Sequence, residues 1–546
     1  MIARFLHTQS KSVTFSANIL IFSSFISAVL GILRDRLLVS HFGAGGDTDV
    51  YLAAFRIPDL VYGIFILGGI SVAFLPLFSE LFEKNEKEAW AFASNLFNIL
   101  FAGLALFAAV LFLMAPLLSH IITPGFSPEQ KALTISLMRL MFLSPIFFGI
   151  ASVLSGVVQY FDRFLAYAIA PILYNIGIVV GILFLAPRFG IWGVGLGVAL
   201  GALLYFLVQL PSAIYSGLRW RPVFFLRDPS MKKVWRLAIP RLPGALGYHI
   251  NLILMTALAS TFSVGSITVF SLANNIQAFP INLIGVPFAI AVFPALSRAF
   301  AKKNIDQFRS AFVLAFSEIM FLALPMAVTL FLLRAQIIRL AYGAGRFGWQ
   351  DTRLTAAVLG IFTLGVLFQA LIPLLARTFF SIQNTKTPTI AGLFTVGFNI
   401  ILALLFIRLF SFENMFSKTI AEMLHLQGIQ DLRVLSLPLA LMISGFFQCV
   451  VLSVLLAKKV QHMFMKEFFF AFLKLFIPTV LLGGAIYGTL QVFGMFFTLR
   501  TFGEVFLQTV FALGVGGAVF LLAAWAVKSP QLWSIIGSLK RQFYGK

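Results

Sequence analysis

The sequence is short of charged residues and of cysteine. Only 11% of its 546 residues are charged, compared with about 25% in soluble globular proteins, whereas 60% are hydrophobic and the mean hydropathy is +0.99. So few charges cannot cover a surface that faces water, which excludes soluble enzymes, disordered scaffolds and fibrous proteins. The single cysteine, Cys449, excludes an intramolecular disulfide and a cysteine-based metal cluster. We therefore expect most of the surface to face lipid.

Sequence motifs of catalysis are missing as well. There is no G-x-x-x-x-G-K-[ST] phosphate loop, no H-E-x-x-H zinc motif and no G-x-S-x-G elbow. The six histidines never pair at helical spacing, so we expect no histidine metal site. These absences predict a protein that is not an enzyme and uses no cofactor. The excess of 40 Lys+Arg over 19 Asp+Glu indicates cytoplasmic loops beside anionic lipid headgroups, and we expect no nucleic-acid partner.

Long apolar runs fill most of the chain. A membrane-spanning helix needs roughly 20 mostly apolar residues, and the first such run has no signal-peptide cleavage site, so we expect it to stay in place. The runs predict an all-α polytopic membrane protein of about 14 transmembrane helices. Lys and Arg gather in the even-numbered loops, which predicts that both termini are cytoplasmic. The fourteen expected spans are 13–33, 50–78, 90–114, 133–160, 164–185, 191–215, 237–260, 266–296, 312–333, 354–380, 390–409, 437–457, 468–493 and 505–526.

An internal repeat divides these spans into two lobes. Pro76 and Ser79 map onto Pro294 and Ser297 at one constant offset (294 − 76 = 297 − 79 = 218), within similar flanking sequence. Six spans separate the copies, and an even number predicts two six-helix lobes related by a parallel pseudo-two-fold axis, a transporter architecture with its site between the lobes. The predicted organisation is an N-terminal lobe at 1–225, a C-terminal lobe at 226–432 completed by the twelfth span at 433–460, and two extra helices with a cytoplasmic tail at 461–546.

Ionisable residues gather between 31 and 59, at the end of the first span and the start of the second. An ionisable group inside the bilayer costs ~2.5–3.5 kcal/mol on insertion scales and therefore marks a functional candidate. The helical pattern continues past Arg34, so we expect this cluster to extend the first span. One interpretation is that Arg34 and Arg56 face an inner cavity and bind a diphosphate, with Asp35 and Asp49 orienting them or pairing with them. The other is ordinary ion pairing among Arg34, Asp35 and Asp49 at a helix end.

Polar residues of the second lobe are mostly amides. Amides bind sugar hydroxyls or peptide groups without the cost of a charge, although hydrogen bonding between helices explains them equally well. The sequence leaves the roles of three other residues within spans open, namely Arg139, Glu318 and Arg377. The additional candidates for substrate binding are Arg241, His249, Asn251, Asn274 and Asn275.

Several short stretches match a known family. They are Val29-Leu-Gly-Ile-Leu-Arg34-Asp35, Phe42-Gly-Ala-Gly-Gly-Asp-Thr-Asp49, Ala54-Phe-Arg56-Ile-Pro58-Asp59, Ala73-Phe-Leu-Pro76, Ala278-Phe-Pro280 and Phe293-Pro294. Through them the chain resembles, over essentially its whole length, the lipid II flippase family MurJ (also called MviN) of the multidrug/oligosaccharidyl-lipid/polysaccharide exporter superfamily. The resemblance implies two lobes around a cationic cavity and two C-terminal helices that form a groove for a polyprenyl tail. It also implies that Arg34 is an essential cavity arginine, that Asp49 is a family aspartate, and that Arg56 falls where a basic residue is common.

The chain departs from the family pattern at Ala28, Gly63 and Asn275, where many relatives have arginine. The cavity is therefore expected to be less cationic than usual. We still predict a flippase of peptidoglycan biosynthesis, a transport protein for cell-wall construction and cell shape. It would move undecaprenyl-diphosphate-linked lipid II across the bacterial cytoplasmic (inner) membrane by alternating access, acting as a monomer among membrane lipids.

Two questions stay open at the level of sequence. The energy source is either the membrane potential or a coupling cation. The alternative functions are a flippase for another lipid-linked oligosaccharide and a membrane glycosyltransferase that uses Asp47 and Asp49. A cation-coupled drug exporter would need acidic cavity residues, so Arg34 and Arg56 argue against it.

Overall fold

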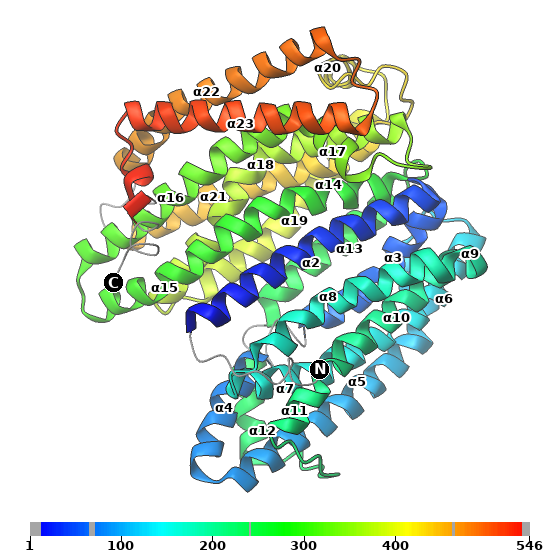
Figure 1. Cartoon of the computed structure of the whole chain (residues 1–546), viewed down its shortest axis with the longest axis vertical. Helices are drawn as coiled ribbons and strands as arrows, with labels where there is room; N and C mark the ends of the chain where they lie inside the picture. Colours follow the sequence, from blue (N-terminus) through cyan, green and yellow to red (C-terminus); the bar gives the residue numbers. More distant parts are fainter. Residues whose placement is uncertain (1–12, 65–70, 240–241, 461–464, 535, 538–546) are drawn as a thin grey trace. The chain divides into compact units, whose positions relative to one another are not determined.

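The structure is a computed structural model that describes residues 13–64, 71–239, 242–460, 465–534 and 536–537. Helices make up most of this part of the chain, and it contains no strand (Figure 1). Within this part, twelve helices are long and apolar enough to cross a membrane. Helices suit lipid because they satisfy their backbone polar groups internally. The predicted all-α membrane class is confirmed.

The chain divides into two compact units. The first comprises Met1–Thr268 with Ala344–Phe347, and the second comprises Val269–Gly343 with Gly348–Lys546. The helices that lie wholly in the first unit are α2 (Val13–Phe42), α3 (Gly46–Tyr62), α4 (Ser71–Lys84), α5 (Glu86–Ile122), α6 (Pro128–Met141), α7 (Leu143–Tyr160), α8 (Phe164–Val180), η2 (Gly181–Leu185), α9 (Ala186–Phe189), α10 (Ile191–Leu207), α11 (Leu210–Tyr215), α12 (Pro229–Ala238) and α13 (Leu242–Ala259).

The remaining helices carry the rest of the chain. The first of them, α14, begins in the last residues of the first unit, and the others belong to the second unit. They are α14 (Ser266–Pro280), η4 (Ile281–Gly285), α15 (Val286–Ala301), α16 (Ile305–Leu332), α17 (Arg334–Tyr342), α18 (Trp349–Ser381), α19 (Lys386–Phe410), α20 (Met415–Met423), η5 (Arg433–Leu435), α21 (Ser436–Lys459), α22 (Met465–Phe496) and α23 (Phe502–Ala526).

Twelve of the fourteen predicted spans coincide with the twelve long apolar helices. The other two, 50–78 and 237–260, run through residues 65–70 and 240–241, which lie outside the described residues. Their flanks are helical, in α3 and α4 and in α12 and α13. The total of fourteen therefore stays a prediction. The prediction that the cluster around Arg34 extends the first span is confirmed, because α2 continues to Phe42.

The first unit extends beyond the lobe boundary predicted at residue 225. Helix α12 packs on α4, and α13 packs on α3 and α5. At the α4–α12 contact Glu80 forms ion pairs with Lys84 (2.8 Å) and Lys233 (3.7 Å). The hydrogen bond from Lys84 and the charge of Lys233 hold the pKa of Glu80 below its ordinary value. All three side chains are exposed, so the pairs add little stability. The position of α13 in the first unit matters more for the site, because it brings the polar side chains of α13 against α3.

Glycines let α8 and α10 approach each other closely. A Cβ added to Gly177 would lie 2.3 Å from the Cα of Gly201, and one added to Gly181 would lie 2.6 Å from the Cα of Gly197. No side chain fits at such separations, so only glycine permits this crossing. The expected spans 164–185 and 191–215 therefore form a helical hairpin, and the glycines of α10 serve its internal packing.

The second unit has its own core. Helix α18 packs on α16 and α21, α19 packs on α21, and α22 packs on both α16 and α23. Fully buried phenylalanines such as Phe312 and Phe379 fill the interior. The repeated segment keeps its local structure in both units: α4 and α15 each contain an internal proline, and the helix that follows each is capped by an asparagine, Asn85 or Asn304. This agreement supports the predicted internal repeat.

Candidate functional site

The guanidinium group of Arg34 is held by two neighbours inside the first unit. Its Nε and Nη2 atoms donate to Oδ1 of Asp35 at 2.9 and 2.7 Å, and its Nη1 atom donates to Oδ1 of Asn175 on α8 at 3.3 Å. The amide of Asn175 is itself fixed, because its Nδ2 donates to the carbonyl (3.3 Å) and hydroxyl (3.1 Å) of Ser27 and to the carbonyl of Pro171 (3.2 Å). The arginine is therefore oriented before any ligand arrives.

Arg34 lies well before the C-terminal end of α2. It stands eight residues before the helix end at Phe42 (42 − 34 = 8), which is about 12 Å at the rise of an α-helix. Its side chain is 24% exposed and the side chain of Asp35 is 11% exposed. The pair thus lies within α2 and not at its end, and Asp35 pairs with the arginine, which both interpretations allow.

A second polar group joins α3 to α13. The Nε atom of Arg56 donates to Oγ1 of Thr256 at 2.8 Å, and Thr256 donates its own hydroxyl to the carbonyl of Leu252 at 2.8 Å. One turn further along α3, Oδ2 of Asp59 lies 3.7 Å from Nδ1 of His249. Residues three apart share a helix face, so Arg56 and Asp59 present a cation and an anion to the same side of α13.

Gly63 completes this contact by having no side chain. A Cβ at position 63 would lie 2.0 Å from Nε2 of His249, and the nearest ring carbon would be 2.6 Å away. The imidazole therefore lies directly on the backbone of α3. A histidine from another helix fills the space beside this glycine.

Aromatic side chains surround both groups. The ring of Phe148 on α7 lies 4.9 Å from that of Tyr62 and 5.1 Å from that of Tyr174. Tyr174 is close enough to interact electrostatically with both Arg34 and Asp59. It therefore connects the two polar groups within the first unit. These tyrosines and Asp59 are not among the residues predicted from the sequence. The signal that could have indicated them is a phenol or a carboxylate inside an apolar span.

Asp49 has partners other than those we predicted. Its Oδ2 accepts from the backbone N–H of Gly265 at 2.7 Å, and its Oδ1 accepts from the backbone N–H and the hydroxyl of Thr268 at 2.8 and 2.6 Å. The carboxylate, 97% buried by residue, thus binds the unpaired N–H groups at the start of α14. The prediction that Asp49 orients or pairs with an arginine is wrong, because its oxygens are occupied by a helix terminus.

Other predicted residues lie elsewhere. Arg241 lies outside the described residues. Asn251 is half-buried on α13 in the first unit. In the second unit Asn274 accepts from Gln277 (3.3 Å), which also bonds Gln369 on α18 (3.4 Å), while Asn275 is exposed. This contact supports the interpretation of the amides as groups that join helices.

The three residues whose roles we left open have separate surroundings. Arg139 donates to the carbonyl of Phe112 at 3.1 Å and stacks on its ring. Glu318 accepts from the hydroxyl of Ser534 at 2.9 Å. Arg377 is half-buried on α18. The first two thus have partners within their own units that account for their positions without a ligand.

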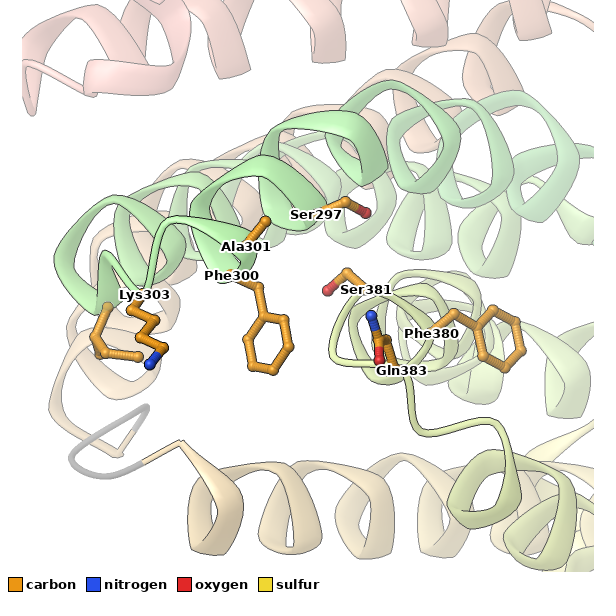
Figure 2. A pocket seen from close by; sticks show the side chains of 8 residues that line it. Ser297, Phe300, Ala301, Lys303, Phe380, Ser381 and Gln383 are labelled. Atoms are coloured by element: carbon orange, nitrogen blue, oxygen red, sulfur yellow. The ribbon is translucent and has the colours of Figure 1, made fainter.

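A pocket of about 700 Å³ lies in the second unit, between the turn after α15 and the end of α18 (Figure 2). Figure 2 shows Lys303 at one side and Ser381 and Gln383 at the other. Its lining contains one cation and no carboxylate. None of the predicted site residues lines it, so the candidate site is the polar cluster of the first unit.

A polytopic helical fold with arginines, a carboxylate and an imidazole packed together between its helices is typical of a membrane transporter. Residues 38–507 match the family model described as lipid II flippase MurJ. The chain belongs to this family, as its sequence predicted, and it is a multi-pass membrane protein.

Individual relatives and solved structures agree with this family. A probable lipid II flippase MurJ of Rhizobium tropici is 31% identical over 389 residues, covering 69% of this chain and 73% of that protein. A probable lipid II flippase MurJ of Vibrio cholerae is 28% identical over 453 residues, covering 78% of this chain and 85% of that protein. The fold is similar to a lipid II flippase MurJ in an inward closed conformation, with a TM-score of 0.72 and 24% identity over 92% of this chain and 97% of that one. It is also similar to an inward-facing multidrug resistance MATE family transporter of the MOP superfamily, with a TM-score of 0.62 and 16% identity over 79% of this chain and 94% of that one.

Proposed function

We propose that this chain moves lipid II, the undecaprenyl-diphosphate-linked peptidoglycan precursor, from the inner to the outer leaflet of the bacterial cytoplasmic membrane. Family membership supports the substrate. The observation that carries the proposal is the pair of arginines, Arg34 and Arg56, each held by side-chain hydrogen bonds inside membrane helices. Guanidinium groups bind phosphate oxygens through two parallel donors, which suits a diphosphate.

A bound diphosphate would change the partners of Arg34. Asp35 takes two of its donors and Asn175 takes a third. A diphosphate would replace these contacts, and its negative charge would offset that of the two arginines. This difference in interaction free energy is what a ligand needs in order to shift a conformational equilibrium. Alternating access between two lobes would then expose the headgroup to the other side.

The remaining parts of the proposal follow from the family pattern. Arg241, Asn251, Asn274 and Asn275 would contact the sugar or peptide, and the polyprenyl tail would lie along α22 and α23, whose outward faces are apolar. Both termini would be cytoplasmic, and the protein would act as a monomer. The membrane potential favours export of a diphosphate by ~2.3 kcal/mol per charge per 100 mV.

A glycosyltransferase that uses Asp47 and Asp49 is not favoured. Both carboxylate oxygens of Asp49 already accept hydrogen bonds from Gly265 and Thr268. A carboxylate held in this way does not act as a general base without breaking the start of α14.

The proposal is tested by complementation of a bacterium depleted of its own lipid II flippase. We expect growth with the wild-type chain and none with Arg34→Ala at equal membrane levels. Arg188→Ala is the matched control, since Arg188 is exposed on α9, and it should support growth. Normal growth of the double variant Arg34→Ala/Arg56→Ala would contradict the proposal.

A further inference from the structure

His249 and Asp59 form the one His–carboxylate pair found within 4 Å among the described residues. The pair joins two helices of the same unit, α3 and α13. His249 is 9% exposed and the side chain of Asp59 is 35% exposed. A titratable pair that is partly open and lies within two predicted spans is expensive to keep, and structural packing alone would be served by apolar residues.

The pair lies within the candidate site. Arg56 is on the same face of α3 as Asp59, and both interact electrostatically with His249. The other titratable groups that face the pair are Tyr62 on α3 and Tyr174 on α8, both of which interact with Asp59. On α13 the group is Tyr248, which interacts with Arg56. A phenol stays neutral near pH 7, so the charge of the cluster is decided by His249, Asp59 and Arg56.

Gly63 leaves the space that the imidazole of His249 occupies. Its ring lies so close to the backbone at position 63 that any side chain there would collide with it. The group that packs against α3 at this point is therefore one whose charge depends on pH.

We propose that His249 and Asp59 form a proton-binding site, and that protonated His249 is the third cation that holds the diphosphate. The proposal rests on the proposed function, since it concerns the same ligand. With neutral imidazole, Arg56 and Asp59 sum to zero charge. When His249 takes up one proton from water, its ring becomes an imidazolium and the cluster carries +1.

The two binding events strengthen each other. A bound diphosphate stabilises the imidazolium, and the imidazolium stabilises the diphosphate by the same factor, because coupling between sites is reciprocal. Diphosphate affinity is therefore highest at pH values where His249 is protonated and falls as the pH rises through its titration. Each molecule bound near the midpoint takes up a fraction of a proton, and the lipid leaves more readily where the site loses that proton.

The test measures binding to the purified, detergent-solubilised full chain. The probe is a short-chain prenyl-diphosphate-N-acetylglucosamine, whose diphosphate is esterified at both ends and keeps its charge between about pH 5 and 8, the range in which histidine titrates. We expect the wild-type affinity to fall about tenfold across this range, the factor that corresponds to one pK unit of coupling. His249→Gln should bind weakly and without this dependence. His120→Gln is the matched control, because His120 is exposed at the end of α5, and it should behave as wild type.

A charge-replacement variant keeps the test independent of folding defects. His249→Ala vacates the space over Gly63, and the double variant Gly63→Arg/His249→Ala puts a permanent cation there. We expect this variant to recover the affinity of the wild type at low pH and to keep it at high pH. A pH-dependent double variant, or a His249→Gln variant that retains the wild-type pH dependence, would overturn the inference. Failure of the wild type to bind the probe at any pH would instead overturn the proposed function.

Discussion

The carboxylate of Asp49 accepts two hydrogen bonds from Thr268, a residue 219 positions away in the chain. Together with the bond from Gly265 it closes the start of α14. This contact joins the beginning of α3 to the end of the first unit, and it converts a residue that looked like part of the site into a helix cap.

Asp49→Ala should therefore lower stability. It leaves the N–H groups of Gly265 and Thr268 buried without a partner, and a lost cap costs about 0.5–2 kcal/mol. We expect a lower melting temperature for the purified protein in detergent, while the fraction that remains folded still binds the diphosphate probe. Asp47→Ala is the control because Asp47 is exposed. An Asp49→Ala protein with unchanged melting and no probe binding would show that Asp49 serves the site.

Arg34→Lys should fail to replace arginine. Lysine presents a compact charge and cannot offer the two parallel donors that Arg34 now directs at Asp35. We expect about a tenfold loss of lipid II export, measured by the accessibility of the lipid on the outer face of cells. Arg188→Lys should leave export unchanged. Equal export by Arg34→Lys and wild type would mean that charge alone suffices at this position.

Gly197→Ala should disturb the crossing of α8 and α10. A Cβ there would lie 2.8 Å from the Cα of Gly181 and 3.0 Å from the carbonyl oxygen of Gly177. Overpacking of this kind costs about 1–3 kcal/mol, which should appear as a lower melting temperature. Gly103→Ala is the matched control, because nothing lies within 4 Å of a Cβ at that position. Equal melting temperatures of the two variants would mean that α8 and α10 can move apart without a loss of stability.

Asp59→Asn should move the pH dependence of binding toward lower pH. Asp59 is the carboxylate that faces Nδ1 of His249, and its negative charge favours the imidazolium. Without it the histidine protonates only at lower pH, because a nearby opposite charge raises the pKa of a base. The measurement is probe affinity as a function of pH, with the midpoint compared between variant and wild type. A midpoint that stays in place or rises would contradict the pairing.

Much of the fold followed from local patterns. The apolar runs predicted the twelve long helices that are described, because a membrane helix is specified by its own length and hydropathy. The continuation of α2 past Arg34 was predicted for the same reason, because it is a property of a single helix. The short motifs in the first sixty residues also sufficed for the family.

The partners of each polar residue were decided by tertiary structure. Nothing in the spacing of residues indicates that Asn175 holds Arg34, that Thr256 accepts from Arg56 or that His249 covers Gly63. Helical periodicity assigns a side chain to a face, but only the packing of helices distant in sequence determines what that face meets. The sequence therefore determined that buried charge exists in this protein, and the packing of α3, α8 and α13 decided which charges act together.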